Sequence, residues 1–219
     1  MIMSETLNRK FNRSKSRYRT KQALTKTELN DLLAWLREDR SIKGVENYAI
    51  VLTLVTSGLR ASELCQLNWG DLYVDDGRHT VYFTAKGGKA AEQELYPASV
   101  AAAEDYFQAQ FRRTPNPGDH FFYTLENYKG RTLAPLKSPT LWARICEIGF
   151  AATNAGVMTR ELEFSPHLFR RTFATLYYKQ TRDLKATQLA TRHASVDVLM
   201  KHYVDSAQGI SEVVSKILD

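Results

Sequence analysis

The sequence predicts a mainly α-helical domain with a small three-stranded antiparallel sheet, an α+β fold. Most of the chain after residue 23 places apolar residues at helical spacing. Residues 72–97 differ, because β-branched and aromatic residues there alternate with polar ones and two glycine-containing turns, DDGR and KGGK, divide the stretch. We therefore expect one folded domain at residues 24–219, preceded by a basic flexible arm or linker at residues 1–23.

The first helices are predicted from capping and periodicity. Thr25 and Glu28 have the spacing of a capping box, and leucines recur at helical spacing through residues 29–36. Residues 45–57 form an apolar segment without a polar face, which predicts a buried helix that ends near Gly58. A short helix is expected next, at residues 61–69.

The strands of the small sheet are expected at residues 72–76, 79–85 and 92–97. Helix returns at residues 100–113, before a loop rich in proline and glycine and a short strand at residues 121–124. The remaining helical patterns lie at residues 138–156, 165–180, 184–192, 195–203 and 210–219.

The balance of charge favours a polyanionic partner. The chain has a formal net charge of +6 and an isoelectric point of about 9.3. Basic residues are dense in the arm, where both DNA-backbone contact and a solvated tail fit the composition. The arm residues that we assign to DNA binding are Arg9, Lys10, Arg13, Lys15, Arg17 and Arg19.

The two cysteines, Cys65 and Cys146, are far apart and belong to no CxxC or Cys/His array. This pattern argues against a disulfide framework and a structural zinc site, and it is typical of reduced thiols. No apolar segment is long enough to span a bilayer, and the N-terminus has no apolar signal core. We therefore expect no metal, no membrane association and a cytoplasmic, nucleoid-associated location.

Two motifs carry arginines suited to phosphate. Arg60, in GLRASEL, is expected at the start of a helix, where a guanidinium can donate two hydrogen bonds to one phosphate. Glu63 follows on the same face. In SPHLFRR, Ser165 suits the N-cap, His167 falls in the first turn and Arg170 lies one turn later. A helix N-terminus disfavours imidazolium, so we expect a largely neutral His167. Taken alone, each motif also fits an ordinary surface pair.

Two further features carry groups that can transfer protons or attack phosphorus. Lys86 and Lys89 lie on a glycine-rich hairpin whose tip can reach a DNA groove, although a solubilising turn has the same composition. His193 precedes a short predicted helix, and Tyr203 lies at the far end of that helix. A tyrosine that anchors a helix would be equally ordinary in isolation.

Together and in this order, these features resemble the tyrosine recombinase (phage integrase) family, which carries an Arg, a Lys, a His-x-x-Arg, a later His or Trp and a nucleophilic Tyr. The resemblance extends from Leu24 to the C-terminus and implies the catalytic-domain fold of that family. Lys86 is matched in preference to Lys89, because the family's lysine is usually the first in such a turn. The matched catalytic residues are Arg60, Lys86, His167, Arg170, His193 and Tyr203, with Glu63 in support.

The sequence departs from the family pattern in two places. Arg192 stands where the family usually has a glycine before the second histidine, at a tight turn or helix end. We assign Arg192 to DNA binding, together with Lys89 and Arg171. The N-terminal helical core-binding domain of most members has no counterpart here, so either it has been removed or the chain resembles short members such as the fimbrial phase-variation inverters.

The resemblance implies site-specific DNA recombination or integration, by metal-free strand cleavage and rejoining through a 3′-phosphotyrosyl intermediate. In that chemistry Tyr203 is the nucleophile, His167 the base and Lys86 the acid, and no cofactor takes part. Arg60, Arg170 and His193 contact the phosphate oxygens.

The implied partners are a double-stranded DNA recombination site and further copies of the chain in a homo-tetramer on DNA, with room for accessory DNA-bending or directionality factors. Two alternatives stay open: a type IB topoisomerase-like enzyme that relaxes DNA, and a non-catalytic DNA-binding regulator derived from the family. The sequence does not distinguish integration, excision, inversion and dimer resolution, and it does not give the target site.

Overall fold

A computed structural model describes residues 22–85, 87–126, 132–197 and 199. It confirms the predicted fold class, because helices predominate in this part of the chain and three strands form an antiparallel sheet in the order β1-β2-β3. The predicted arm falls almost entirely outside the described residues. The helices are α1 (Lys26–Glu38), α2 (Ile42–Ser57), α3 (Ala61–Leu64), α4 (Pro97–Phe111), α5 (Ser138–Asn154), α6 (Pro166–Thr181) and α7 (Leu184–Thr191), with a 3-10 turn η2 (Trp69–Asp71).

Helix α1 begins at the predicted capping box. The Glu28 amide donates to Thr25 Oγ1 at 3.2 Å, and the Thr25 amide donates to Glu28 Oε2 at 2.8 Å. Leu29, Leu32 and Leu36 are buried on the face that packs against α2. The apolar period of the sequence therefore corresponds to one buried face of this helix.

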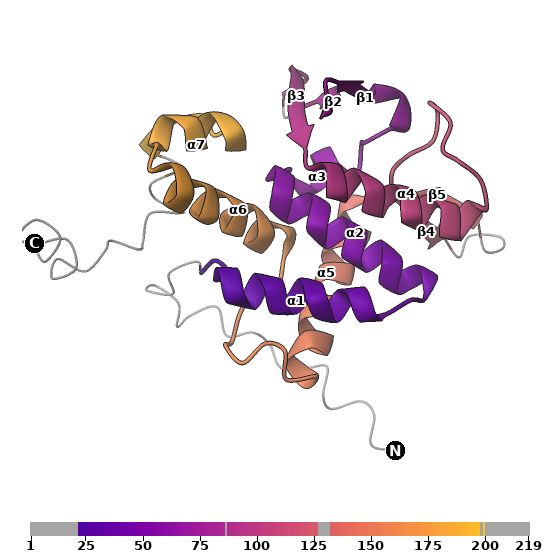
Figure 1. Cartoon of the computed structure of the whole chain (residues 1–219), viewed down its shortest axis with the longest axis horizontal. Coiled ribbons are helices and arrows are strands. Elements are labelled where there is room, and N and C mark those ends of the chain that lie inside the picture. The colour runs from indigo at the N-terminus through magenta and orange to yellow at the C-terminus, as the bar shows by residue number, and fades with distance from the viewer. Residues whose placement is uncertain (1–21, 86, 127–131, 198, 200–219) are drawn as a thin grey trace, which may run out of the picture.

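Helix α2 lies at the centre of the core. Every residue from Ala49 to Val55 is buried, and α1, α4 and α6 pack around the helix (Figure 1). A helix enclosed in this way needs no polar face, which explains the continuous apolar run of its sequence. Gly58 ends α2 with a left-handed φ of 63°, so that the chain turns sharply toward α3.

The small sheet keeps the alternation predicted from its sequence. Its strands are β1 (Leu72–Asp75), β2 (Arg78–Thr84) and β3 (Ala90–Leu95). On β2, Val81 and Phe83 are buried, whereas Tyr82 between them is exposed. The hairpin from β2 to β3 is closed by a bond of 2.8 Å from the Ala85 amide to the Lys89 carbonyl oxygen. The base of the lysine hairpin is thus held by the sheet.

The helix predicted at residues 61–69 ends earlier, at Leu64. Beyond it the chain pairs with a distant segment, because the Phe121 amide donates to the Leu67 carbonyl oxygen at 2.9 Å. Trp69 stacks on Phe121 with ring centroids 4.1 Å apart. This long-range pairing uses backbone groups that a longer helix would need.

A second correction concerns the short strand expected at residues 121–124. The strand is β4 (Tyr123–Glu126), and it pairs antiparallel with β5 (Thr132–Pro135), which the sequence analysis did not anticipate. β5 is short and ends in proline, so it lacks the pattern by which a strand is predicted.

None of the helices in the described part of the chain is long and apolar enough to cross a membrane.

Candidate active site

Arg60 is placed by the turn that follows α2. It is the N-cap residue of α3, and its backbone amide donates to Glu63 Oε2 at 2.8 Å. Its guanidinium donates from Nη1 to Glu63 Oε1 at 2.6 Å and from Nη2 to the Arg192 carbonyl oxygen at 3.1 Å. The predicted pair of Arg60 and Glu63 therefore exists, and a third residue from the far end of the chain joins it.

Glu63 is almost completely buried, and its carboxylate bridges two guanidinium groups. Oε2 lies 2.7 Å from Arg192 Nη2, and Oε1 pairs with Arg60. Burial of the carboxyl raises its pKa, but the Arg60 amide and the two guanidinium groups outweigh burial and hold the pKa of Glu63 below its usual value. Glu63 is therefore ionised near neutral pH and can orient both arginines.

Helix α6 places His167 and Arg170 one turn apart, as predicted. Ser165 is at the N-cap position and Pro166 begins the helix, although the Ser165 hydroxyl makes no capping bond. His167 is exposed, and its ring lies edge-on to Trp142 of α5 with centroids 6.3 Å apart. The imidazole therefore faces the surface beside an aromatic side chain.

Arg170 is buried and braces two segments against each other. Its Nη1 donates to the Gly58 carbonyl oxygen and its Nη2 donates to the Thr191 carbonyl oxygen. These carbonyls belong to the turn after α2 and to the last residue of α7, so Arg170 ties together the two turns that carry Arg60 and His193.

The end of α7 positions His193. Arg192 caps the helix with a left-handed φ of 53°, and the His193 amide donates to the Gln188 carbonyl oxygen at 3.1 Å. Gln188 Nε2 donates back to the His193 carbonyl oxygen at 3.0 Å. The turn that sequence analysis expected before His193 is therefore present, with arginine at the position that favours glycine.

Thr191 contacts the ring of His193. The Thr191 hydroxyl has one hydrogen, and its oxygen lies 2.7 Å from the Thr187 carbonyl oxygen and 2.5 Å from His193 Nδ1. Because the hydroxyl can donate its hydrogen to the Thr187 carbonyl oxygen, we expect Nδ1–H to be the donor in the contact between the ring and Thr191.

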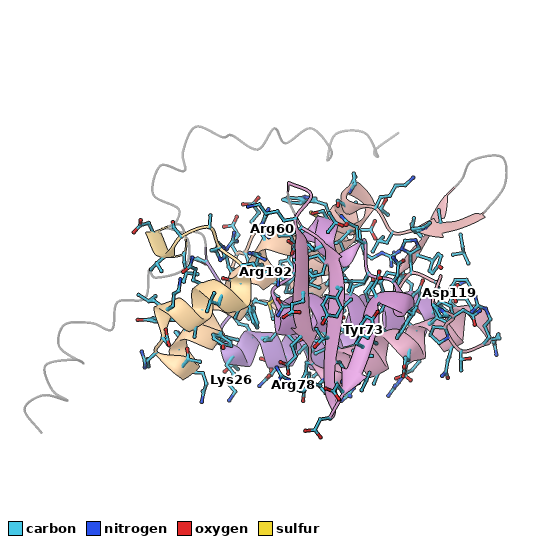
Figure 2. The ribbon with its side chains drawn as sticks, turned by 90° about the horizontal axis from the view of Figure 1, so that it is seen from above. Lys26, Arg60, Tyr73, Arg78, Asp119 and Arg192 are labelled. Atoms are coloured by element: carbon cyan, nitrogen blue, oxygen red, sulfur yellow. The ribbon has the colours of Figure 1, made fainter. Side chains whose placement is uncertain are left out.

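The structure brings five of the predicted residues into one cluster on three helix ends: Arg60, Glu63, Arg170, Arg192 and His193. Figure 2 shows Arg60 and Arg192 next to each other in this cluster.

Other predicted residues lie elsewhere or outside the described part of the chain. Lys89 is exposed on its hairpin, and Arg171 donates from Nε to the Gln22 carbonyl oxygen at 3.2 Å. The residues outside the described ranges are Arg9, Lys10, Arg13, Lys15, Arg17, Arg19, Lys86 and Tyr203. Within the described ranges, no group of three or more His, Cys, Asp or Glu side chains is arranged to hold a metal ion.

The comparison with protein families identifies the chain. A family model described as the phage integrase family matches residues 22–209. The chain belongs to the phage integrase family. The match covers α1 to α7 and every residue of the cluster, so the resemblance seen in the motifs extends over the whole described domain.

Relatives of the chain include tyrosine recombinases from archaea and bacteria. Tyrosine recombinase XerA of Pyrococcus furiosus is 26% identical over 195 residues, which cover 89% of this chain and 61% of the relative. Tyrosine recombinase XerC of Neisseria meningitidis serogroup C is 29% identical over 178 residues, covering 81% of this chain and 53% of the relative. The chain thus spans between about half and two thirds of the length of these relatives.

Solved structures share the fold of the chain. XerH site-specific recombinase bound to palindromic difH substrate, in a post-cleavage complex, has a TM-score of 0.70 and 23% identity. That match covers 91% of this chain and 54% of XerH. The XerA recombinase structure has a TM-score of 0.66 and 22% identity, over 90% of this chain and 65% of XerA.

Sequence reasoning missed several residues that position this site. Thr191 and the carbonyl oxygen of Gly58 hold His193 and Arg170, and Phe83 lies under the Arg192 guanidinium. Thr191 could have been noticed as a hydroxyl two residues before the histidine at a helix end. The other contacts join segments far apart in sequence and leave no local pattern.

Proposed function

We propose that this integrase chain is the catalytic part of a site-specific recombinase that cuts and rejoins DNA without a metal ion, through a 3′-phosphotyrosyl intermediate. The observation that supports this most is the convergence of Arg60 and Arg170 on the turn that carries His193. Two guanidinium groups and an imidazole at one place suit the charge that develops on phosphate oxygens during phosphoryl transfer.

In this proposal Tyr203 is the nucleophile. Its oxygen forms a bond to the scissile phosphorus while the bond from phosphorus to the 5′ oxygen breaks. An unperturbed tyrosine has a pKa of about 10, so it needs a base, and His167 takes the phenol proton. Lys86 gives a proton to the departing 5′ oxygen. Attack by the 5′-hydroxyl of a partner strand reverses these transfers and releases Tyr203, so each bond broken is replaced by one formed.

The phosphate is held by the cluster. Arg60 is the more accessible guanidinium, and Arg170 supports the same position from the buried side. Glu63 keeps Arg60 oriented, because its ionised carboxylate lies 2.6 Å from Nη1. His193 faces the phosphate oxygens through its Nε2 side, since its Nδ1 is directed at Thr191. These donors act on the nonbridging oxygens, where negative charge increases in the transition state.

The proposed substrate is a double-stranded recombination site. The net charge of +6 suits a polyanion, and complexes of XerH with difH substrate and of the Tn1549 transposon integrase with circular intermediate DNA support DNA as the partner. Lys89, Arg171 and the arm are proposed to contact the DNA backbone. Assembly as a tetramer on DNA, with accessory bending or directionality factors, belongs to the same proposal.

Covalent trapping tests the proposed reaction. The chain is mixed with labelled duplex from its own flanking locus, nicked near candidate sites so that the cleaved fragment is lost and rejoining is prevented. EDTA is present, the reaction is stopped with detergent, and Tyr203→Phe is run beside the wild type on a denaturing gel. We expect a protease-sensitive, DNA-linked band from the wild type alone.

The other outcomes are equally informative. A band of equal intensity from Tyr203→Phe would exclude Tyr203 as the nucleophile. A band that appears only when a divalent metal replaces EDTA would exclude the metal-free mechanism. Clear binding on a native gel without any covalent band would mean that the chain binds DNA and does not cut it.

A further inference from the structure

In the described part of the chain, three arginines end helices in the left-handed conformation, and one of these three directs its side chain inward. Arg112, Arg182 and Arg192 cap α4, α6 and α7 with φ values of 57°, 55° and 53°. This conformation is unfavourable for a residue other than glycine, and glycine is the usual residue at such a helix end. Arg112 and Arg182 are exposed, whereas the Arg192 side chain is only 17% exposed.

The Arg192 side chain is held at the catalytic cluster. Its Nη2 lies 2.7 Å from Glu63 Oε2, and the other oxygen of that carboxylate lies 2.6 Å from Arg60 Nη1. The Arg192 carbonyl oxygen also accepts a bond of 3.1 Å from Arg60 Nη2. Residue 192 therefore fixes Arg60 twice, once through its own backbone and once through Glu63.

The same guanidinium also contacts the sheet. Its central carbon lies 5.2 Å from the ring centroid of Phe83, which is a cation–π distance. Phe83 is buried near the end of β2, immediately before the hairpin that Ala85 and Lys89 close. Arg192 thus connects the strand leading to the lysine hairpin, the carboxylate that orients Arg60, and the turn before His193.

We infer that Arg192 is a positioning residue for strand cleavage, which locks Arg60 through Glu63 and fixes the base of the lysine hairpin against the His193 turn. This role replaces the DNA contact expected from the sequence, because the guanidinium is turned toward Glu63 and Phe83. The inference rests on the proposed function, in which Arg60 and His193 act on the scissile phosphate.

Arg192→Gly is the decisive variant, because glycine suits the left-handed backbone and only the side-chain contacts are lost. We expect the single-turnover rate of covalent complex formation, at saturating DNA, to fall about 10- to 100-fold. DNA affinity should stay within about twofold, since a positioning residue does not contact the DNA. Arg182→Gly is the matched control: it changes the same residue type at the same kind of helix end, and its rate should equal that of the wild type.

Two further variants separate positioning from general stability. Arg192→Lys should recover part of the lost rate, because an ammonium can pair with Glu63 but lacks the planar guanidinium that lies over Phe83. The rate losses of Arg192→Gly and Glu63→Gln should be clearly less than multiplicative in the double variant, because the two residues share one of the contacts that hold Arg60. Fully multiplicative rate losses, or a loss of DNA affinity with an unchanged rate at saturation, would overturn the inference.

A measurement without DNA tests the contact itself. In denaturant unfolding, the same double-mutant cycle should give a coupling of about fivefold or more in the unfolding equilibrium constant. Absence of coupling would exclude the Arg192–Glu63 contact on which the inference depends. If the wild type forms no covalent complex, the proposed function fails. Coupling in unfolding would then show that the contact of Arg192 with Glu63 exists but has a purely structural role, and this result also overturns the inference.

Discussion

At the scale of single residues, Gly58 shows how the backbone constrains the site. Its φ is 63°, and a Cβ atom there would overlap the ring of Phe173. Its carbonyl oxygen accepts a hydrogen bond from the buried Arg170. Both the conformation and the space therefore require glycine at the turn between α2 and Arg60.

The first prediction is that Gly58→Ala destabilises the fold by more than its backbone conformation explains. Gly77 has a similar φ of 74° with no atom within 4 Å of a built Cβ, so Gly77→Ala isolates the conformational cost of about 1 kcal/mol. Gly58→Ala should cost about 1–3 kcal/mol more, because Phe173 has to move. Denaturant unfolding of both variants checks this, and equal losses would contradict the steric argument.

Thr191 carries the second prediction. Thr191→Val keeps the shape of the side chain and removes the oxygen that accepts from His193 Nδ1. Ring 15N chemical shifts should report the Nδ1–H tautomer for neutral His193 in the wild type, and a shift toward the Nε2–H tautomer in the variant. Thr187→Val is the control, since the Thr187 hydroxyl donates to the Asp183 carbonyl oxygen and does not contact the ring. An Nε2–H tautomer in the wild type would refute the assignment.

The third prediction follows from the lowered pKa of Glu63. A carboxyl with a lower pKa in the folded state binds fewer protons than in the unfolded state, so its stabilisation is present above the ordinary glutamate pKa of 4.5. That stabilisation is lost as pH falls through the folded-state pKa. Glu63→Gln should therefore destabilise the protein by about 2–3 kcal/mol at pH 7, because two guanidinium groups lose their counter-charge.

The difference between Glu63→Gln and the wild type should shrink steadily as pH falls below 4.5, because protonation removes the same charge from the wild type. Urea unfolding of both proteins from pH 7 to pH 3 measures it. A difference that does not depend on pH would mean that the Glu63 charge does not stabilise the fold.

At the scale of elements, the helices and strands that are correctly predicted are those whose pattern lies within a few consecutive residues of the sequence. The capping box at Thr25, the apolar period of α1, the continuous apolar run of α2 and the alternation in β2 are each visible in a few consecutive residues. The end of α3 and the strand β5 depend on partners elsewhere: Leu67 pairs with Phe121, and β5 pairs with β4. Such pairing has no local signal, and it overrides local preference.

The same distinction applies to the candidate site. Arg60 with Glu63, and His167 with Arg170, lie one helical turn apart, so their shared faces could be predicted from spacing. The inward direction of the Arg192 side chain could not be predicted in this way. It depends on Glu63 and Phe83, which precede Arg192 by more than a hundred residues. Arginine ends three of the described helices, at Arg112, Arg182 and Arg192. The sequence around these positions does not show which of the three side chains is directed inward.

At the scale of the whole molecule, three helices meet at a buried ion pair. Glu46 of α2 is 5% exposed and pairs with Arg144 of α5, and the buried Tyr106 of α4 lies beside the same carboxyl. Burial raises the pKa of Glu46, and Arg144 only partly offsets that rise. The pair therefore specifies the relative position of the helices, and its net contribution to the free energy of unfolding is small.

The fourth prediction tests that view. Arg144→Met alone should destabilise the protein by about 3 kcal/mol, because it leaves the Glu46 carboxyl buried without a counter-charge. The double variant Glu46→Gln and Arg144→Met should recover most of this loss, because no charge then stays buried. Lys43 and Glu147 join the same two helices at 3.1 Å with both side chains about two thirds exposed, so they provide the control. Glu147→Gln should change the unfolding free energy by less than about 1 kcal/mol, and Glu147 is not among the charged residues that act on Glu46. A double variant as unstable as Arg144→Met would show that the ion pair itself, and not the avoidance of a lone buried charge, holds α2 and α5 together.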